Sequence, residues 1–228
     1  MSNEVLFFIE FFAVFSGVLV MYKAFGKHGL YAWMIFAAVV SNLQVQKYIH
    51  VFGITATLGN ALYASSFLAT DILSENFSDR EARKGVFMGF AVMLIMLLVY
   101  AITLWFVPEP FDVAHDSLKN VIGFTSMRIV AASFAAYLIS NTLDITFFSK
   151  IHSKYPRLPW LRNNGSTFMS QLIDTAVFVP CAFYGAVDSK SFWEILISTY
   201  IFKVVGALID TPFFYASRSR MMKKPLFE

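Results

Sequence analysis

Residues 162–178 read RNNGSTFMSQLIDTAVF, a stretch that begins basic and turn-rich and continues as a long apolar segment. Gln171 and Asp174 lie three residues apart inside the apolar part, so on a helix they share one face. An amide and a carboxylate at that depth in a membrane helix are costly, and such groups usually face a bundle interior or a water-filled cavity. The stretch therefore predicts a bundle of membrane helices arranged around a polar cavity.

The composition of the whole chain indicates a membrane protein. Of the 228 residues, 57% are hydrophobic and 14% are charged, whereas soluble domains average roughly 45–50% and about 25%. The mean hydropathy is +0.61. No polar run is long enough to form a soluble domain, so we expect residues 1–228 to form a single transmembrane transporter domain, an all-α, polytopic integral membrane bundle. The first apolar segment lacks a basic start and a small-residue cleavage site, which favours a retained span.

Seven stretches approach the roughly 20 apolar residues that a membrane-crossing helix needs. The third is short and carries Asn60 and Asp71, which leaves open a re-entrant or broken helix and a count of six spans. The seven stretches are Val5–Ala24, Leu30–Tyr48, Thr57–Leu73, Gly85–Phe106, Phe124–Phe148, Ser166–Val187 and Phe192–Ala216.

The distribution of basic residues favours seven spans over six. Most of the 18 Lys and Arg residues lie in the first, third and fifth connections and in the C-terminal tail. The N-terminus and the other connections carry only Lys47, Lys119 and Lys190. Because cytoplasmic loops are enriched in Lys and Arg, we expect a multi-pass protein of the cell membrane, which is the inner membrane in a Gram-negative bacterium. Its N-terminus would lie outside and its C-terminus in the cytoplasm.

Several charged residues fall well inside apolar stretches, where they usually serve function. With four carboxylates and two cations, we expect internal pairing and carboxylates left over for another partner. Lys203 is too close to mid-span to reach the headgroups, and Asp174 is its natural partner. The six residues are Asp71, Arg128, Asp144, Asp174, Lys203 and Asp210.

These groups also have structural interpretations that the sequence leaves open. Asp71 and Glu75 share a helix face and can pair with the basic residues that follow them. Asn141 and Asp144 can cap a helix or bond between helices. Arg128 can extend its guanidinium to the headgroups.

The sequence offers little sign of catalysis or of a bound cofactor. The four histidines lie at span ends or in loops without ligand spacing, and the single cysteine, Cys181, lies in an apolar run. We therefore expect no metal, no cofactor and no enzyme activity. The basic segments are short and adjoin the lipid, so we expect no nucleic-acid partner. A lipid or quinone enzyme would need a reactive constellation that is not visible, and a purely structural subunit would pair all its intramembrane charges.

Amides and carboxylates among aromatic residues suit a flat, polar solute. A carboxylate accepts two parallel hydrogen bonds from an edge such as that of guanine, an amide meets the adjacent carbonyl, and aromatic rings stack on the base. The same groups would also serve an amino acid, a vitamin or a proton relay, so these residues alone leave the solute open.

Four ordered blocks resemble the queuosine precursor transporter family, once catalogued as vitamin uptake transporters. They are FLATDILSENFSDREARKGV (67–86), RIVAASFAAYLISNTLDITFF (128–148), RNNGSTFMSQLIDTAVF (162–178) and KVVGALIDTPFFY (203–215). The resemblance implies import of 7-deazaguanine precursors of queuosine across the cytoplasmic membrane. It also implies a fold similar to the substrate-binding subunits of energy-coupling-factor importers, with about six spans.

On this interpretation the cavity binds a small molecule within the lipid bilayer. We expect Asp174 and Gln171 to bind the guanine-like edge, with Asp71 or Asn60 opposite them. Aromatic side chains would stack on the base. The full set of expected substrate-binding residues is Asp174, Gln171, Asp71, Asn60, Phe178, Tyr63 and Asn141.

A second set of residues is expected to hold the network together or to gate the cavity. The resemblance assigns candidate roles to all of them by motif match. They are Lys203, Asp210, Arg128, Asp144, Glu75 and Ser166. Another vitamin or small polar solute remains the alternative substrate, and a homo-oligomer remains open.

Overall fold

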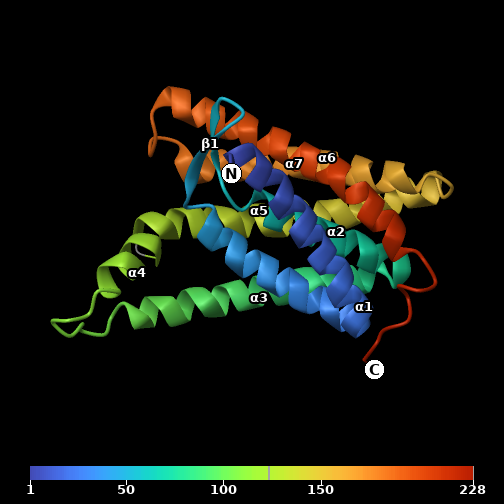
Figure 1. The fold of residues 1–228 in the computed structure, drawn as a ribbon, viewed down its shortest axis with the longest axis horizontal. Coiled ribbons are helices and arrows are strands. Elements are labelled where there is room, and N and C mark those ends of the chain that lie inside the picture. The colour runs from blue at the N-terminus through green and yellow to red at the C-terminus, as the bar shows by residue number, and fades with distance from the viewer. Residues whose placement is uncertain (123, 228) are drawn as a thin grey trace.

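The computed structural model describes residues 1–122 and 124–227, and most of them are helical (Figure 1). This confirms the predicted all-α bundle of long apolar helices. The helices are α1 (Asn3–Gln44), α2 (Asn60–Asn76), α3 (Asp79–Thr103), α4 (His115–Ile122), α5 (Phe124–Lys154), α6 (Pro159–Phe183) and α7 (Ser189–Ser217), and the two antiparallel strands are β1 (Tyr48–Val51) and β2 (Ile54–Thr57).

Helix α1 is a helical hairpin, because Gly26 breaks it with φ 58° and ψ −135°. Glycine adopts such a conformation readily, whereas residues with a Cβ rarely do. Gln44 Nε2 donates to Glu10 Oε1 at 3.0 Å, so the two halves run antiparallel. The halves correspond to the first two spans that the sequence predicts.

The long helices run between two ends of the molecule (Figure 1). At one end, here called the hairpin end, Asn3 near the N-terminus bonds to His50 of β1. At the other, the basic end, Lys23 at the turn of α1 donates to the carbonyl of Met221 in the C-terminal tail. Helix α2 begins directly after β2 at the hairpin end and finishes beside the C-terminus of α7 at the basic end (Figure 1). The chain therefore passes between the two ends seven times, in agreement with the seven expected spans.

Within the described residues, four helices are long and apolar enough to cross a membrane, judged by length and composition. Helix α1 counts once among them although it contains two passages. Helix α2 has only 17 residues and is largely buried inside the bundle. The α3 side chains Phe87, Ile95 and Leu98 are exposed and apolar, as expected of a surface that contacts lipid.

Several predicted boundaries were wrong. The second stretch stops being helical at Gln44, and Tyr48 and Thr57 belong to a β-hairpin that the sequence analysis missed. The third stretch forms one continuous helix, so a broken or re-entrant segment is excluded there. The basic connection at residues 149–164 is mostly helical, because α5 continues to Lys154 and α6 begins at Pro159.

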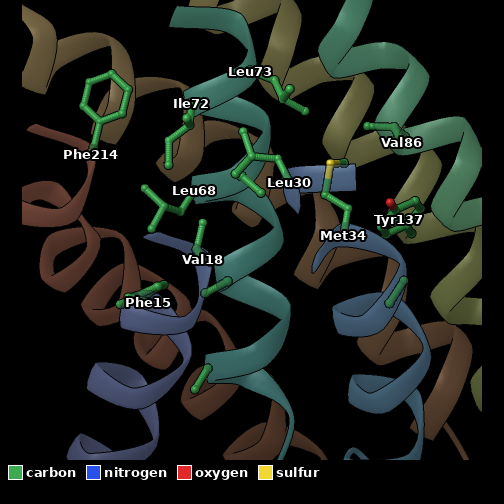
Figure 2. Close-up of a cluster of buried hydrophobic side chains, with 14 of the residues drawn as sticks. Phe15, Val18, Leu30, Met34, Leu68, Ile72, Leu73, Val86, Tyr137 and Phe214 are labelled. Carbon is green, nitrogen blue, oxygen red and sulfur yellow. The ribbon is translucent and has the colours of Figure 1, made fainter. Parts of the chain in front are cut away.

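Helix α2 occupies the centre of the bundle, and Figure 2 shows its apolar contacts. Leu68, Ile72 and Leu73 lie in one cluster with Leu30 and Met34 of α1. Every residue from Asn60 to Leu73 except Tyr63 is buried. A helix that is enclosed on all sides can present polar groups only to other helices, so the polar residues of α2 must find partners inside the protein.

Candidate functional site

The centre of the candidate site is the buried carboxylate of Asp174 on α6. Lys203 of α7 forms an ion pair with its Oδ2 atom, and both side chains are at most 3% exposed. Tyr63 of α2 donates its hydroxyl proton to Oδ1 at 2.6 Å, and Ser140 of α5 donates to the same atom at 2.8 Å. One carboxylate therefore joins four helices.

The surroundings of this ion pair offset the cost of burying it. Two charges taken out of water must be paired and must satisfy their remaining hydrogen bonds, or the desolvation cost exceeds their attraction. Tyr63 and Ser140 supply two such bonds to Asp174. The ammonium of Lys203 also lies 5.0 Å from the centroid of the Tyr63 ring, within the range of a cation–π contact. The predicted pairing of Lys203 with Asp174 is confirmed.

A cavity with a volume of about 40 Å³ adjoins the ion pair. That space holds a few water molecules, so a purine-sized solute requires side chains to move. Leu58 and Gly59, which follow β2, line it and place it toward the hairpin end. Its other lining residues come from α1, α2, α5, α6 and α7, and from Val45 directly after α1. They are Ala38, Ser41, Asn42, Val45, Asn60, Tyr63, Ser133, Ala136, Tyr137, Asp174, Phe178, Thr199 and Lys203.

The cavity includes part of the substrate-binding set that the sequence predicts. Four of its members line the cavity: Asp174, Asn60, Phe178 and Tyr63. Three others are buried elsewhere. Gln171 has no hydrogen-bond partner on either amide atom within the described residues, and Asn141 donates to the carbonyl of Tyr137 at 3.0 Å. Asp71 lies in a separate group of carboxyl side chains.

Sequence reasoning missed other residues at the site, notably Ser140, Asn42 and Thr199. Ser140 bonds directly to Asp174, and the other two line the cavity. The Oδ1 atom of Asn42 and the hydroxyl of Thr199 have no hydrogen-bond partner within the part of the chain that the structure describes. Ser140 lies four residues before Asp144 on α5, and that helical spacing was the available signal.

The carboxylate cluster consists of Asp71 on α2, Asp144 on α5 and Asp210 on α7. All three are at most 1% exposed. Ser170 donates to Asp144 at 2.9 Å, and Asn163 donates to Asp210 at 2.8 Å. Among the described residues, none of the three carboxylates has a Lys, Arg or His partner within ion-pair distance.

The remaining members of the predicted network set bond near the ends of the bundle or to backbone. Glu75 of α2 pairs with Arg162 of α6 and Arg218 just after α7, at the basic end. Arg128 donates to the carbonyls of Cys181 and Tyr184 at 2.7 and 2.6 Å, which ties the start of α5 to the end of α6. The Ser166 hydroxyl donates to the Asn163 carbonyl at 3.3 Å. The described residues contain no group of three or more His, Cys, Asp or Glu side chains arranged to hold a metal ion.

Comparison with known proteins assigns the chain to a family. A family model described as "Putative vitamin uptake transporter" matches residues 57–217, which contain both the Asp174–Lys203 pair and the carboxylate cluster. A protein of Bacillus subtilis named "Probable queuosine precursor transporter" is 43% identical over 212 residues, covering 91% of this chain and 92% of the relative. The chain belongs to the queuosine precursor transporter family.

More distant members of the queuosine precursor transporter family align over most of the chain as well. The "Queuosine precursor transporter" of Escherichia coli is 30% identical over 192 residues, or 82% of this chain and 83% of the relative. A relative from Haemophilus influenzae is 30% identical over 166 residues, or 71% and 68%. These names are those of transporters, in agreement with the prediction of a transporter and not an enzyme. No solved structure matches, so the expected similarity to energy-coupling-factor subunits stays a prediction.

Proposed function

We propose that this chain imports 7-deazaguanine precursors of queuosine and binds the base in the cavity beside Asp174. The observation that carries the proposal is a fully buried carboxylate at the wall of a cavity that also contains amide, hydroxyl and aromatic groups. An ionised carboxylate accepts two parallel N–H bonds, which matches the N–H and amino edge of a guanine-like base. The queuosine precursor names of the relatives support this choice of solute.

The remaining cavity groups can complete recognition of such a base. The Oδ1 atom of Asn42 and the hydroxyl of Thr199, which have no partner among the described residues, would accept an N–H group and donate to a carbonyl, respectively. The side chains of Tyr63 and Phe178 offer ring faces for stacking. Burying a polar atom without a hydrogen bond is costly. A solute that forms hydrogen bonds with these two atoms should therefore bind more tightly than one that does not.

Binding of the base would rearrange the contacts of Asp174. Its Oδ1 atom already accepts two hydrogen bonds and its Oδ2 atom accepts one from Lys203. A bidentate edge therefore displaces Lys203, Tyr63 or both from the carboxylate. The same displacement widens the cavity, since both side chains line it.

We also propose the direction of import, from the distribution of basic residues between the two ends. The basic end carries the turn of α1 and the C-terminal tail, whose Lys and Arg residues favour the cytoplasm. The hairpin end, with the N-terminus, then faces outside. The cavity lies toward the hairpin end, so a base would reach it from outside.

Ligand-dependent thermal stability of the purified protein tests this function. A ligand at 100 times its dissociation constant adds about 2.7 kcal/mol to the free energy of unfolding. We expect 7-deazaguanine bases to raise the melting temperature, guanine to raise it less, and a panel of vitamins to leave it unchanged. The shift is expected to be lost in Asp174→Asn and kept in Asp116→Asn, which alters an exposed residue of α4. A shift with a vitamin alone would overturn the proposed substrate.

A further inference from the structure

The buried charges of the bundle do not balance. Two ion-pair groups compensate buried carboxylates. Asp174 pairs with Lys203, and Glu75 pairs with Arg162 and Arg218. Three buried carboxyl groups then remain, on Asp71, Asp144 and Asp210, without a cation within ion-pair distance among the described residues. Three uncompensated negative charges inside a membrane bundle would be very costly, so protons must neutralise part of the cluster.

Asp71 and Asp144 have very different surroundings. Asp144 accepts a hydrogen bond from Ser170 on its Oδ1 atom at 2.9 Å. Asp71 has no donor to either oxygen within the described residues, although it is 1% exposed. The carboxyl group of Asp144 on α5 is the charged neighbour that acts on it most strongly. An ionised carboxylate that is buried without a donor or a counter-charge is very costly, so Asp71 is the member of the pair that most needs a proton.

Among the described residues, no cation lies within ion-pair distance of Asp71. Leu30 and Met34 of α1 and Val86 of α3 form the apolar side of this part of α2 (Figure 2). The charged groups that act on Asp71 are Asp144 from α5, Asp210 from α7 and Glu75 one turn along α2. Helix α6 contributes Arg162 and Asp174, and α7 also contributes Lys203, all of them engaged in the two ion-pair groups.

The cluster shares its helices with the cavity. Ser170, which holds Asp144, precedes Asp174 by four residues on α6, a rise of about 6 Å. Helix α2 carries both Tyr63 and Asp71, and α7 carries both Lys203 and Asp210. A base that displaces Lys203 or Tyr63 from Asp174 therefore acts on the same helices that carry the cluster. The shared helices provide a physical connection between the two sites.

We propose that Asp71 and Asp144 form a proton-binding site, supported by Asp210, whose occupation is coupled to movement of the solute. The inference rests on the proposed function for the identity of that solute. A proton from the outer solution binds the shared carboxyl pair, and the same proton leaves as hydronium to the cytoplasmic side when the cavity opens there. No bond other than O–H is made or broken. The proton gradient then drives accumulation.

Uptake by proteoliposomes tests the coupling, with tritiated 7-deazaguanine as the probe and a pH-sensitive dye inside. With one proton per solute, an inward gradient of about one pH unit supports about tenfold accumulation. We expect this accumulation in the unaltered protein, accompanied by internal acidification, and its loss on adding a protonophore. Asp71→Asn keeps the shape of the side chain but cannot release a proton. It should exchange labelled for unlabelled base without net accumulation, whereas Asp116→Asn should accumulate normally. Accumulation that survives the protonophore, or gradient-driven accumulation by Asp71→Asn, would overturn the proposal.

Infrared spectroscopy tests the proton site without any solute. A protonated carboxyl group has a C=O stretching band that an ionised one lacks, and we expect such a band at neutral pH. It should disappear in Asp71→Asn and persist in Asp116→Asn. If Asp71→Asn does not fold, Asp144→Asn, which removes the second carboxyl group of the pair, should shift or abolish the band. A missing band in the unaltered protein, or one unchanged by both substitutions, refutes the site. Failure to bind 7-deazaguanine with the band present would refute only the proposed function.

Discussion

Arg162 of α6 holds the carboxylate of Glu75 on α2 with two parallel hydrogen bonds, Nε to Oε2 at 2.9 Å and Nη2 to Oε1 at 2.6 Å. The guanidinium is 1% exposed and also donates to the carbonyl of Pro156 at 3.0 Å. Arg218 adds a third bond to Glu75 from the end of α7. These contacts join three helices at the basic end, below the carboxylate cluster, where a solute would leave toward the cytoplasm.

Replacing Arg162 should therefore cost more than replacing Arg218, although both contact the same carboxylate. Removing one partner of a buried ion pair costs about 3–5 kcal/mol, because the other charge is left uncompensated. Arg218 is 35% exposed, and pairs at such positions contribute about 0–1 kcal/mol. We expect a large loss of thermal stability in detergent for Arg162→Ala and a small one for Arg218→Ala. Equal losses would show that the bidentate contact contributes no more than the exposed one.

The Lys203–Asp174 pair should show strong coupling between its two members. Lys203→Met leaves Asp174 with its bonds from Tyr63 and Ser140 but without a counter-charge. Asp174→Asn leaves an unpaired ammonium. The double variant removes both charges, so its loss of stability should be smaller than the sum of the two single losses, with a coupling of about 0.5–3 kcal/mol.

A ligand-binding measurement on the double variant distinguishes the role of Asp174 in stability from its role in recognition of the base. The double variant restores charge balance but lacks the carboxylate that the base would contact. We expect it to fold and yet give no thermal shift with 7-deazaguanine. A double variant that still binds would show that Asp174 maintains the bundle and does not contact the base.

The main features of the fold were accessible from the sequence because membrane helices are long, apolar and bounded by charged loops. The pairing of Lys203 with Asp174 was also predictable, because an ammonium near mid-span cannot reach the headgroups and needs a buried anionic partner. The β-hairpin was missed because its apolar residues extended the adjoining spans. Its signal was the Phe52–Gly53 turn, where both residues have positive φ, as a type I′ hairpin turn requires.

The residues that make up the site were harder to predict from the sequence, because neighbouring positions on one helix face can pack against different helices. Gln171 and Asp174 differ by about 60° around α6, and only Asp174 lines the cavity. Asp71 lies eight residues beyond Tyr63 on α2, a rise of about 12 Å. It therefore belongs to a deeper layer with Asp144 and Asp210. Rotation and depth depend on packing between helices, which a single sequence does not specify.

Gly26 provides a test of the α1 hairpin and of its contact with the C-terminal tail. A Cβ at this position would lie 3.0 Å from Cγ of Pro225 and would also have to adopt φ 58°. The tail is held there by Lys23, which donates to the Lys224 carbonyl at 2.7 Å, and by Leu226 N–H, which donates to the Lys23 carbonyl at 2.9 Å.

Gly26→Ala should therefore destabilise the protein by about 1–3 kcal/mol, the usual cost of a strained backbone conformation. Gly165→Ala is a suitable control, since this glycine is helical and its nearest neighbour, the flexible end of Ile151, lies 3.2 Å from the added Cβ. Thermal unfolding measures the stability of both variants, and limited proteolysis reports release of the tail. Release of the tail with unchanged stability would show that Pro225 makes the critical contact and that the turn tolerates a Cβ. A loss of stability with the tail still protected would place the cost in the backbone of the turn.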